Sequence, residues 1–144
     1  MAEQNFANHT KFFPPFHFFV LPVLLINFGW SIYRLKNWAY SLDGFLAVAV
    51  AAALILGFLS ARIFALTVQD RVIRLEEQLR YTRLLPADLQ SRVGEFTVAQ
   101  FVSLRFASDA ELPALARKVL DDKLTERKAI KQLVKNWKPD YLRA

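Results

Sequence analysis

The sequence of 144 residues contains no cysteine, and this absence excludes several classes of function. Without thiols the chain has no disulfide framework, no iron–sulfur ligand set and no cysteine nucleophile. Two histidines, His9 and His17, are too few for a multi-histidine metal site within one chain. No Ser/His/Asp set, glycine-rich phosphate loop or HExxH motif is present. We therefore predict that the protein is not an enzyme, and we expect no cofactor.

Charged residues are scarce in one half of the chain and frequent in the other. Hydrophobic residues make up 54% of the sequence, and Arg34, Lys36 and Asp43 are the only charged residues between Phe12 and Ala61. By contrast, the remainder to the C-terminus has 16 Lys and Arg against 11 Asp and Glu. Such a chain is neither a uniformly soluble globule nor a protein buried wholly in a membrane.

Two apolar segments are long enough to cross a bilayer as helices. The first follows a polar segment over residues 1–11 and covers residues 12–33, where Pro22 should kink or loosen the first two turns. A short loop, 34–41, leads to the second predicted helix over 42–85. Because the loop is so short, the two spans should form an antiparallel hairpin. Aromatic rings suited to a membrane surface cluster near the loop, and these predicted anchors are Trp30, Tyr33, Trp38 and Tyr40.

The second helix is predicted to leave the bilayer and continue in water. No proline or glycine occurs between Gly57 and Pro86, so nothing ends the helix where charged residues begin at Arg62. The rest of the chain, 86–144, has the pattern of short amphipathic helices. The predicted fold class is an all-α membrane protein, a two-helix transmembrane hairpin whose second helix extends into a small cytoplasmic helical domain.

The predicted helical domain shows helix starts, a core and a basic face. The spacings Thr97-Val-Ala-Gln100 and Ser108-Asp-Ala-Glu111 both fit a capping box, and Thr125 is placed to cap a last helix that Pro139 ends. Apolar residues at helical spacing predict the core: Leu115, Val119, Ile130, Leu133 and Trp137. Lysines at steps of three to four predict a basic side of the last helix, which faces solvent or docks onto anionic lipid: Lys128, Lys131, Lys135 and Lys138.

Two rows of residues on the second helix predict surfaces for packing against other helices. A strip of small residues within the span would let a helix backbone approach closely: Ala49, Ala53, Gly57 and Ala61. Farther along, apolar residues recur at alternating steps of three and four as a heptad seam: Ala65, Val68, Val72, Leu75 and Leu79. Either the chain's own tail or other chains would cover this seam. The regular steps favour other chains, and hence a cyclic homo-oligomer.

Four segments carry a resemblance to known sequences: Ala65-Leu-Thr-Val-Gln-Asp-Arg-Val-Ile-Arg-Leu-Glu-Glu77, Leu84-Leu-Pro86, Arg105-Phe-Ala-Ser-Asp-Ala-Glu-Leu-Pro113, and the ending Lys128-Ala-Ile-Lys131 with Trp137-Lys-Pro-Asp-Tyr-Leu-Arg143. They resemble a family of small bacterial membrane proteins whose function is unknown. The likeness covers nearly the whole chain and implies a two-span protein of the bacterial inner (cytoplasmic) membrane. It implies no activity, ligand or catalytic residue.

The orientation of the spans follows from the distribution of basic residues. The positive-inside rule places the flank richer in Lys and Arg in the cytoplasm. The loop has two basic residues, Arg34 and Lys36, whereas five arginines closely follow the second span: Arg62, Arg71, Arg74, Arg80 and Arg83. We therefore predict that both termini are cytoplasmic.

The expected function is that of a structural or accessory membrane protein, which acts as a scaffold for self-association or as a subunit of a larger bacterial membrane complex. One alternative is a haem- or pigment-holding subunit of an electron-transfer or photosynthetic complex, with His17 as an axial ligand. A third is a small oligomeric channel or transport component. The expected partners are the lipid bilayer and either the protein itself or another membrane subunit. Nucleic acid is not expected, since the tail has no helix-turn-helix, zinc or RNP pattern and its acidic and basic residues alternate.

Overall fold

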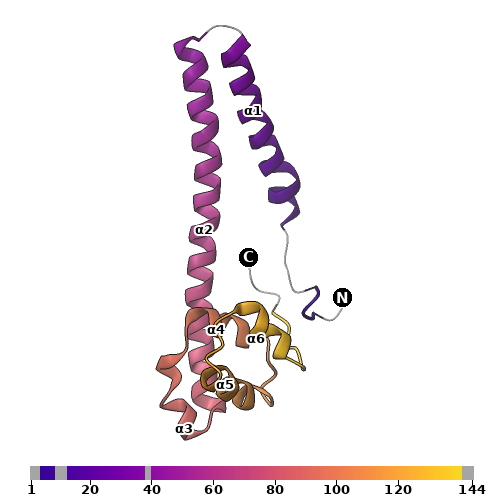
Figure 1. Ribbon diagram of the computed structural model, residues 1–144, viewed down its shortest axis with the longest axis vertical. Helices are drawn as coiled ribbons and strands as arrows, with labels where there is room; N and C mark the ends of the chain where they lie inside the picture. Colours follow the sequence, from indigo (N-terminus) through magenta and orange to yellow (C-terminus); the bar gives the residue numbers. More distant parts are fainter. Residues whose placement is uncertain (1–3, 9–12, 38–39, 141–144) are drawn as a thin grey trace. The chain divides into compact units, whose positions relative to one another are not determined.

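The computed structural model describes residues 4–8, 13–37 and 40–140. Every regular element within them is a helix, so the all-α prediction is confirmed. In chain order, the elements are the π-helix η1 (Pro15–Val20), α1 (Leu21–Asn37), α2 (Leu42–Leu84), α3 (Ala87–Gln90), the 3₁₀-helix η2 (Val93–Glu95), α4 (Val98–Leu104), α5 (Leu112–Asp121) and α6 (Arg127–Leu133) (Figure 1). The chain divides into two compact units, which we call the span unit (residues 11–66) and the tail unit (residues 1–10 and 67–144), and α2 contributes to both.

Two helical segments, Pro15–Asn37 and Leu42–Leu84, are long and apolar enough to cross a membrane. In the most apolar stretch of each, only 6% of the residues are buried within the chain. A core helix of a soluble protein would be mostly buried, so the chain leaves these apolar surfaces uncovered. The second segment ends at Leu84, one residue before the predicted limit of 85.

The first apolar segment starts as a π-helix. Two prolines, Pro14 and Pro15, open it, which suits the first turn because that turn has no backbone partners to lose. Around Pro22, which has no N–H to donate, the backbone takes the wider pattern: the N–H of Leu21 donates to the carbonyl of Phe16, five residues earlier. The turns before Pro22, which the sequence predicts to be loosened, are therefore the ones that form the π-helix.

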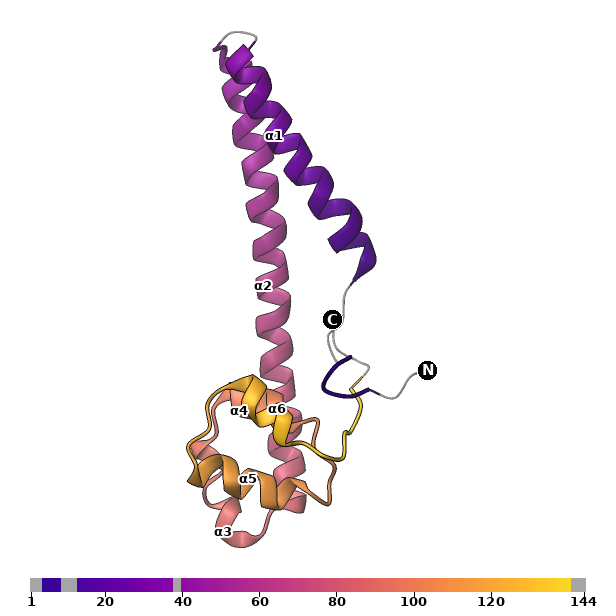
Figure 2. The ribbon, with the colours of Figure 1, turned by 45° about the vertical axis from the view of Figure 1, so that its right-hand side comes forward.

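Within the span unit, α1 and the start of α2 approach each other closely (Figure 2). A Cβ atom added to Gly44 would lie 2.9 Å from the Leu35 side chain, so only glycine fits here without displacing that leucine. Ser31 of α1 and Ala51 of α2 are buried. The side chain of Ser41 accepts a hydrogen bond of 3.1 Å from the Gly44 N–H and so caps α2.

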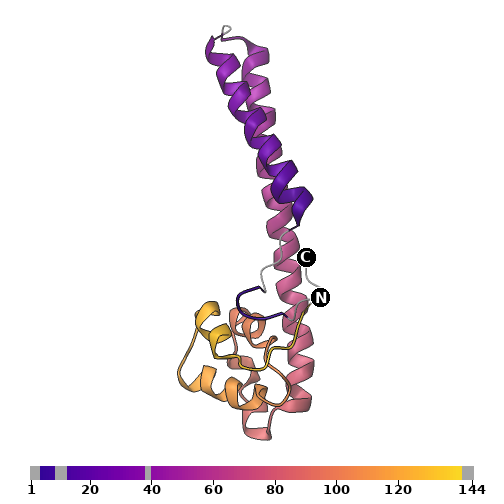
Figure 3. The ribbon, with the colours of Figure 1, turned by 90° about the vertical axis from the view of Figure 1, so that its right-hand side faces the viewer.

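Within the tail unit, α4, α5 and α6 pack beside the last turns of α2 (Figure 3). The predicted capping box forms at the start of α4, where Thr97 and Gln100 satisfy each other's backbone N–H groups. These helices enclose one hydrophobic core. Its buried members are Tyr81, Leu85, Leu89, Phe96, Phe101, Leu104, Ala107, Leu112, Leu115, Ala116, Val119, Leu120, Ile130 and Val134.

The last helix is shorter than predicted. It begins after Glu126 instead of Thr125 and ends at Leu133, and Val134 already has extended backbone angles (φ −70°, ψ 118°). The segment that follows pairs with the backbone just after α4: the Ser108 N–H donates to the Asn136 carbonyl at 2.9 Å, and the Lys138 N–H donates to the Phe106 carbonyl at 2.7 Å. The prediction that this helix continues to Trp137 is therefore wrong, because tertiary hydrogen bonds replace the helical ones.

Candidate functional site: two opposite faces of helix α2

The tail unit covers one face of α2. Ile73, Glu77, Tyr81 and Leu85 are only 5%, 7%, 0% and 3% exposed, respectively. They recur every four residues, so they follow one side of the helical path, and we call them the covered face. Tyr81 lies against two aromatic rings of the tail unit, with centroid distances of 5.4 Å to Phe96 and 5.2 Å to Phe101. Glu77 is therefore buried, although it is charged and lies on the part of the helix that is predicted to continue in water.

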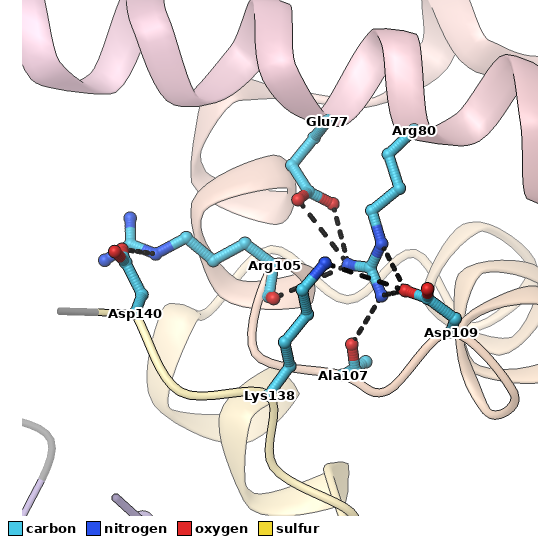
Figure 4. Close-up of polar contacts among 7 residues, drawn as sticks. All are labelled: Glu77, Arg80, Arg105, Ala107, Asp109, Lys138 and Asp140. Carbon is cyan, nitrogen blue, oxygen red and sulfur yellow. Dashed lines mark hydrogen bonds and ion pairs between the residues drawn. The ribbon is translucent and has the colours of Figure 1, made fainter. Parts of the chain in front are cut away.

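An arginine next to the covered face joins α2 to the segment after α4. Figure 4 shows the Arg80 guanidinium between Glu77 on one side and Ala107 and Asp109 on the other. Arg80 Nη1 lies 3.2 Å from Glu77 Oε2, its Nη2 donates to the Ala107 carbonyl at 2.7 Å, and its Nε donates to Asp109 Oδ1 at 2.9 Å. The Arg80 side chain is only 11% exposed, so these charge-assisted bonds are largely shielded from water.

The pKa values of the acidic groups around Arg80 are shifted in opposite directions. Burial raises the pKa of Glu77, and the charge of Arg80 only partly opposes that rise. Burial, helped by the charge of Glu77, also raises the pKa of Tyr81 well above its usual value. The more exposed Asp109 has a lowered pKa, mainly because Arg80 donates a hydrogen bond to its carboxylate. The arrangement is that of a structural ion-pair network, since two cations, Arg80 and Lys138, face the two carboxylates Glu77 and Asp109.

A second ion pair, between Arg105 and Asp140, lies next to a contact between Gln4 and Asp140 within the tail unit. Arg105 Nε lies 3.1 Å from Asp140 Oδ2 (Figure 4). The Arg105 guanidinium also lies 4.5 Å from the centroid of the Phe106 ring. The side chain of Gln4 binds the backbone of Asp140 twice: its Oε1 accepts from the N–H at 2.8 Å, and its Nε2 donates to the carbonyl at 3.5 Å. Gln4, near the start of the chain, is thus bound to Asp140, near its end.

An open cavity of about 700 Å³ lies beside these ion pairs. Acidic and basic side chains line it in equal numbers: Glu76, Glu77, Asp109 and Asp140, and Arg80, Arg83, Arg105 and Lys138. This balance gives the cavity no excess charge that would select an anion or a cation. No group of three or more His, Cys, Asp or Glu placed to hold a metal ion occurs in the described part of the chain.

The opposite side of α2 is apolar and exposed. Val68, Val72, Leu75 and Leu79 are 59%, 46%, 62% and 62% exposed, respectively, and we call these four residues the exposed stripe. At about 100° per residue, Leu75 and Leu79 point roughly 200° away from Glu77, which places the stripe opposite the covered face. Ala65, the fifth residue of the predicted seam, is also exposed and lies in the span unit. The fold-back alternative placed the chain's own tail over this seam, but the described tail packs on the other side.

The small-residue strip is also uncovered. Ala49, Ala53, Gly57 and Ala61 are all exposed, and among the described residues no heavy atom lies within 4 Å of a Cβ built on Gly57. Helix α1 instead meets α2 near Gly44 and Ala51. Helix α1 therefore does not cover this strip within the described chain.

The residues predicted for a pigment site and for membrane anchoring lie on the span unit. His17 has its Nδ1 2.9 Å from the Phe13 carbonyl oxygen, and its ring lies edge-on to Phe16. Trp30 and Tyr33 stack with their centroids 5.4 Å apart, and Tyr40 is strongly exposed. Trp38 lies outside the described residues.

The residues predicted for the domain core gather in the tail unit. Leu115, Val119 and Ile130 are buried in the hydrophobic core, and Leu133 and Trp137 pack partly buried against it. The Trp137 ring lies 4.8 Å from that of Phe106. Although the helix ends before it, Trp137 still reaches the core from the extended segment.

The four lysines predicted for the basic side of the last helix do not all lie on that helix. Lys128 and Lys131 lie on α6, but Lys135 and Lys138 follow its end at Leu133. Lys131 lies 5.3 Å from the centroid of the Phe106 ring, and Lys138 lies 3.7 Å from Asp109. The four lysines therefore belong to two different backbone segments, and two of them have partners within the tail unit.

The sequence did not predict the ion-pair residues Arg80, Arg105, Asp109 and Asp140 or the docking residue Gln4. One signal was available for the covered face: Ile73, Tyr81 and Leu85 repeat at multiples of four, with Glu77 completing the series. A buried charge in such a series requires a partner, and Arg80, three residues later, is the nearest basic residue toward the C-terminus. No local pattern indicates Gln4, because its partner is the backbone of a distant residue.

These features define an all-helical protein with two helices apolar enough to cross a membrane and a small helical unit that packs on the end of the second. The whole chain, residues 1–144, matches a family described as a family of unknown function, DUF6526, and the protein belongs to that family. The resemblance to a family of unknown function is thereby confirmed. No curated protein and no solved structure matches the chain.

Proposed function

We propose that the protein is a scaffold or accessory subunit of the bacterial inner membrane. In this proposal, α1 and the charge-free part of α2 form a hairpin in the bilayer, and the tail unit lies in the cytoplasm. The exposed stripe binds a helix of another membrane-anchored chain. The observation that carries the proposal is the contrast on α2, where the chain covers one face with its own core and leaves four apolar residues bare on the other.

Burial supports the membrane part of the proposal. Large apolar side chains of both candidate spans are strongly exposed, including Phe18, Ile26 and Leu56. Each such side chain would gain roughly 1.5–3 kcal/mol by leaving water, and a bilayer provides that environment along the whole helix. The close approach at Gly44 also supports a hairpin, since small residues are typical where membrane helices meet.

The contact between the chain ends supports the proposed orientation. Gln4 binds the Asp140 backbone within the tail unit, whereas the intervening residues 11–66 form the span unit. A chain that leaves one side of a bilayer and returns to bind its own end must cross it an even number of times. Two spans meet this requirement, and the arginines after the second span favour the cytoplasm as the common side.

Affinity purification of the tagged full-length protein from native membranes tests this function. The variant Val72→Glu with Leu75→Lys puts two opposite charges into the stripe, while Ala87→Glu with Ala114→Lys puts the same charges on exposed positions of α3 and α5. We expect the wild type and the control to retain their partner chains, whether second copies or other subunits, and the stripe variant to lose at least about tenfold of them. Equal recovery with both variants would refute the proposal.

A further inference from the structure

We propose that the partner on the exposed stripe is a second copy of this chain, packed parallel and in register. This inference rests on the proposed function, which assigns the stripe to a membrane-anchored partner, and it goes further by naming that partner. In the resulting pair, Val68, Val72, Leu75 and Leu79 each lie beside the same residue of the other copy.

The spacing of the stripe supports a pair of α2 helices. Its residues alternate at steps of three and four, which keeps an apolar seam facing one partner along a left-handed supercoil. In heptad terms, Val72 and Leu79 occupy position a, and Val68 and Leu75 occupy position d. The central pair, Val72 at a followed by Leu75 at d, is the combination that favours two strands, whereas Val68 at d and Leu79 at a do not add to this preference.

The membrane anchor supports the parallel arrangement. Every copy carries the same basic residues beside its second span, so every copy inserts with the same orientation. Their α2 helices then leave the bilayer side by side in the same direction. The tail unit does not obstruct this pairing, because it packs on the covered face, on the opposite side of α2.

Charged residues beside the stripe determine the register. In a parallel pair, a residue at position g of one helix faces position e of the next heptad in the other, five residues farther along. Arg71 occupies a g position and Glu76 an e position, so each Arg71 faces Glu76 of the second copy. Both are exposed, and neither forms an ion pair within the part of the chain that the structure describes. Sliding one copy by seven residues would place Arg71 opposite either Arg83 or Gln69 of the other copy. Arg83 would repel Arg71, and Gln69, which is uncharged, would not attract it.

Single-cysteine cross-linking of the full-length protein in native membranes tests this arrangement. The natural chain has no cysteine, so any disulfide arises from the introduced one. Under mild oxidation, Leu75→Cys should give a covalent dimer of twice the chain mass. Arg74→Cys, on an exposed position beside the stripe residue but turned about 100° around the helix, is the matched control and should give little dimer.

A charge exchange then tests the register on the Leu75→Cys background. Arg71→Glu alone and Glu76→Arg alone each place like charges opposite one another, and each should lower the dimer yield about fivefold. The two changes together restore opposite charges and should restore the yield. A matching loss with Arg74→Glu would show that net charge and not pairing controls the yield, and would contradict the proposed register.

The remaining outcomes separate this inference from the proposed function. If Leu75→Cys forms no dimer while the stripe variant still loses a partner in affinity purification, the partner is a different protein and the inference is refuted, but the proposed function stands. If the stripe variant loses no partner at all, the proposed function fails as well. Restoration by the charge exchange, together with the Leu75→Cys dimer, supports a parallel pair in register.

Discussion

An amphipathic helix is expected to bury its apolar face and expose its charged face, but the two faces of α2 show the opposite arrangement. The face that the chain buries includes Glu77, and Arg80 lies largely buried beside it, whereas the exposed stripe opposite contains only valine and leucine. A single chain therefore uses its less apolar face for its own core and leaves its most apolar row free. A hydrophobic pattern therefore shows which face of a helix requires a partner, but it does not show whether that partner is part of the same chain.

The largest loss of stability is expected for a substitution of Tyr81 on the covered face. Tyr81→Ala removes a fully buried ring that packs on Phe96 and Phe101, and it should lower the free energy of unfolding of the tail unit by about 3–5 kcal/mol. Leu79→Ala on the stripe is the control and should change that free energy by less than about 0.5 kcal/mol in the dissociated protein. Limited proteolysis of the detergent-solubilised chain measures both. A tail that stays equally resistant in the two variants would show that the covered face contributes little.

Substitution of Arg80 should destabilise the tail unit less than substitution of Tyr81. Arg80→Ala leaves Glu77 buried without its cation and removes the bond to the Ala107 carbonyl, so the tail unit should lose about 2–3 kcal/mol of stability. The nearby exposed Arg83→Ala should be nearly neutral. Replacing both members, Glu77→Met with Arg80→Met, should recover part of the loss because no charge then stays buried. Chemical denaturation followed by tryptophan fluorescence compares the three variants, and a double variant less stable than Arg80→Ala would contradict this explanation.

The docking of the N-terminal segment should contribute less. Gln4→Ala removes both hydrogen bonds to the Asp140 backbone, which together stabilise the contact by roughly 1 kcal/mol. The first residues should then exchange backbone hydrogen and be cleaved by protease faster, with the core of the tail unit unchanged. Gln132→Ala, on an exposed position of α6, is the matched control. Unaltered exchange in Gln4→Ala would show that other contacts hold the segment.

Acidification is expected to have the smallest effect on the stability of the tail unit. The carboxylates of Asp88, Glu95 and Asp109 have lowered pKa values, mainly because Arg117, Arg92 and Arg80, respectively, donate hydrogen bonds to them. A lowered folded-state pKa contributes stability that is present above the unfolded-state pKa and is lost as the pH falls through the folded-state pKa. The tail unit should therefore weaken gradually below the usual carboxyl range. Glu77, which has a raised pKa, opposes this trend. Denaturation midpoints measured at decreasing pH show which of the two contributions is larger. A midpoint that rises on acidification would mean that the contribution of Glu77 is larger.

Local sequence signals predicted a large part of the fold. The absence of proline and glycine after Gly57 placed the end of α2 within one residue of Leu84, and the spacing from Thr97 to Gln100 located the start of α4. Such features depend on neighbours a few residues away. The core residues Leu115, Val119 and Ile130 follow from helical spacing in the same way.

The remainder depends on tertiary contacts that no local pattern encodes. The segment from Val134 to Lys138 has helical spacing, yet it leaves the helix because its backbone pairs with Phe106 and Ser108. Glu77 is charged and sits among charged neighbours, yet Arg80 and the tail unit bury it. The exposed stripe was predictable as an apolar seam, but its freedom from the chain's own tail became visible only once the covered face was located.

Light scattering of the intact protein in a mild detergent, with the detergent mass subtracted, tests whether a second copy covers the exposed stripe. We expect a protein mass of twice the 16.6 kDa chain for the wild type and for Ala87→Glu with Ala114→Lys. We expect a single-chain mass for Val72→Glu with Leu75→Lys. A wild type that is already monomeric at 16.6 kDa, or a stripe variant that stays dimeric, would contradict the claim that a second copy covers the exposed stripe of α2.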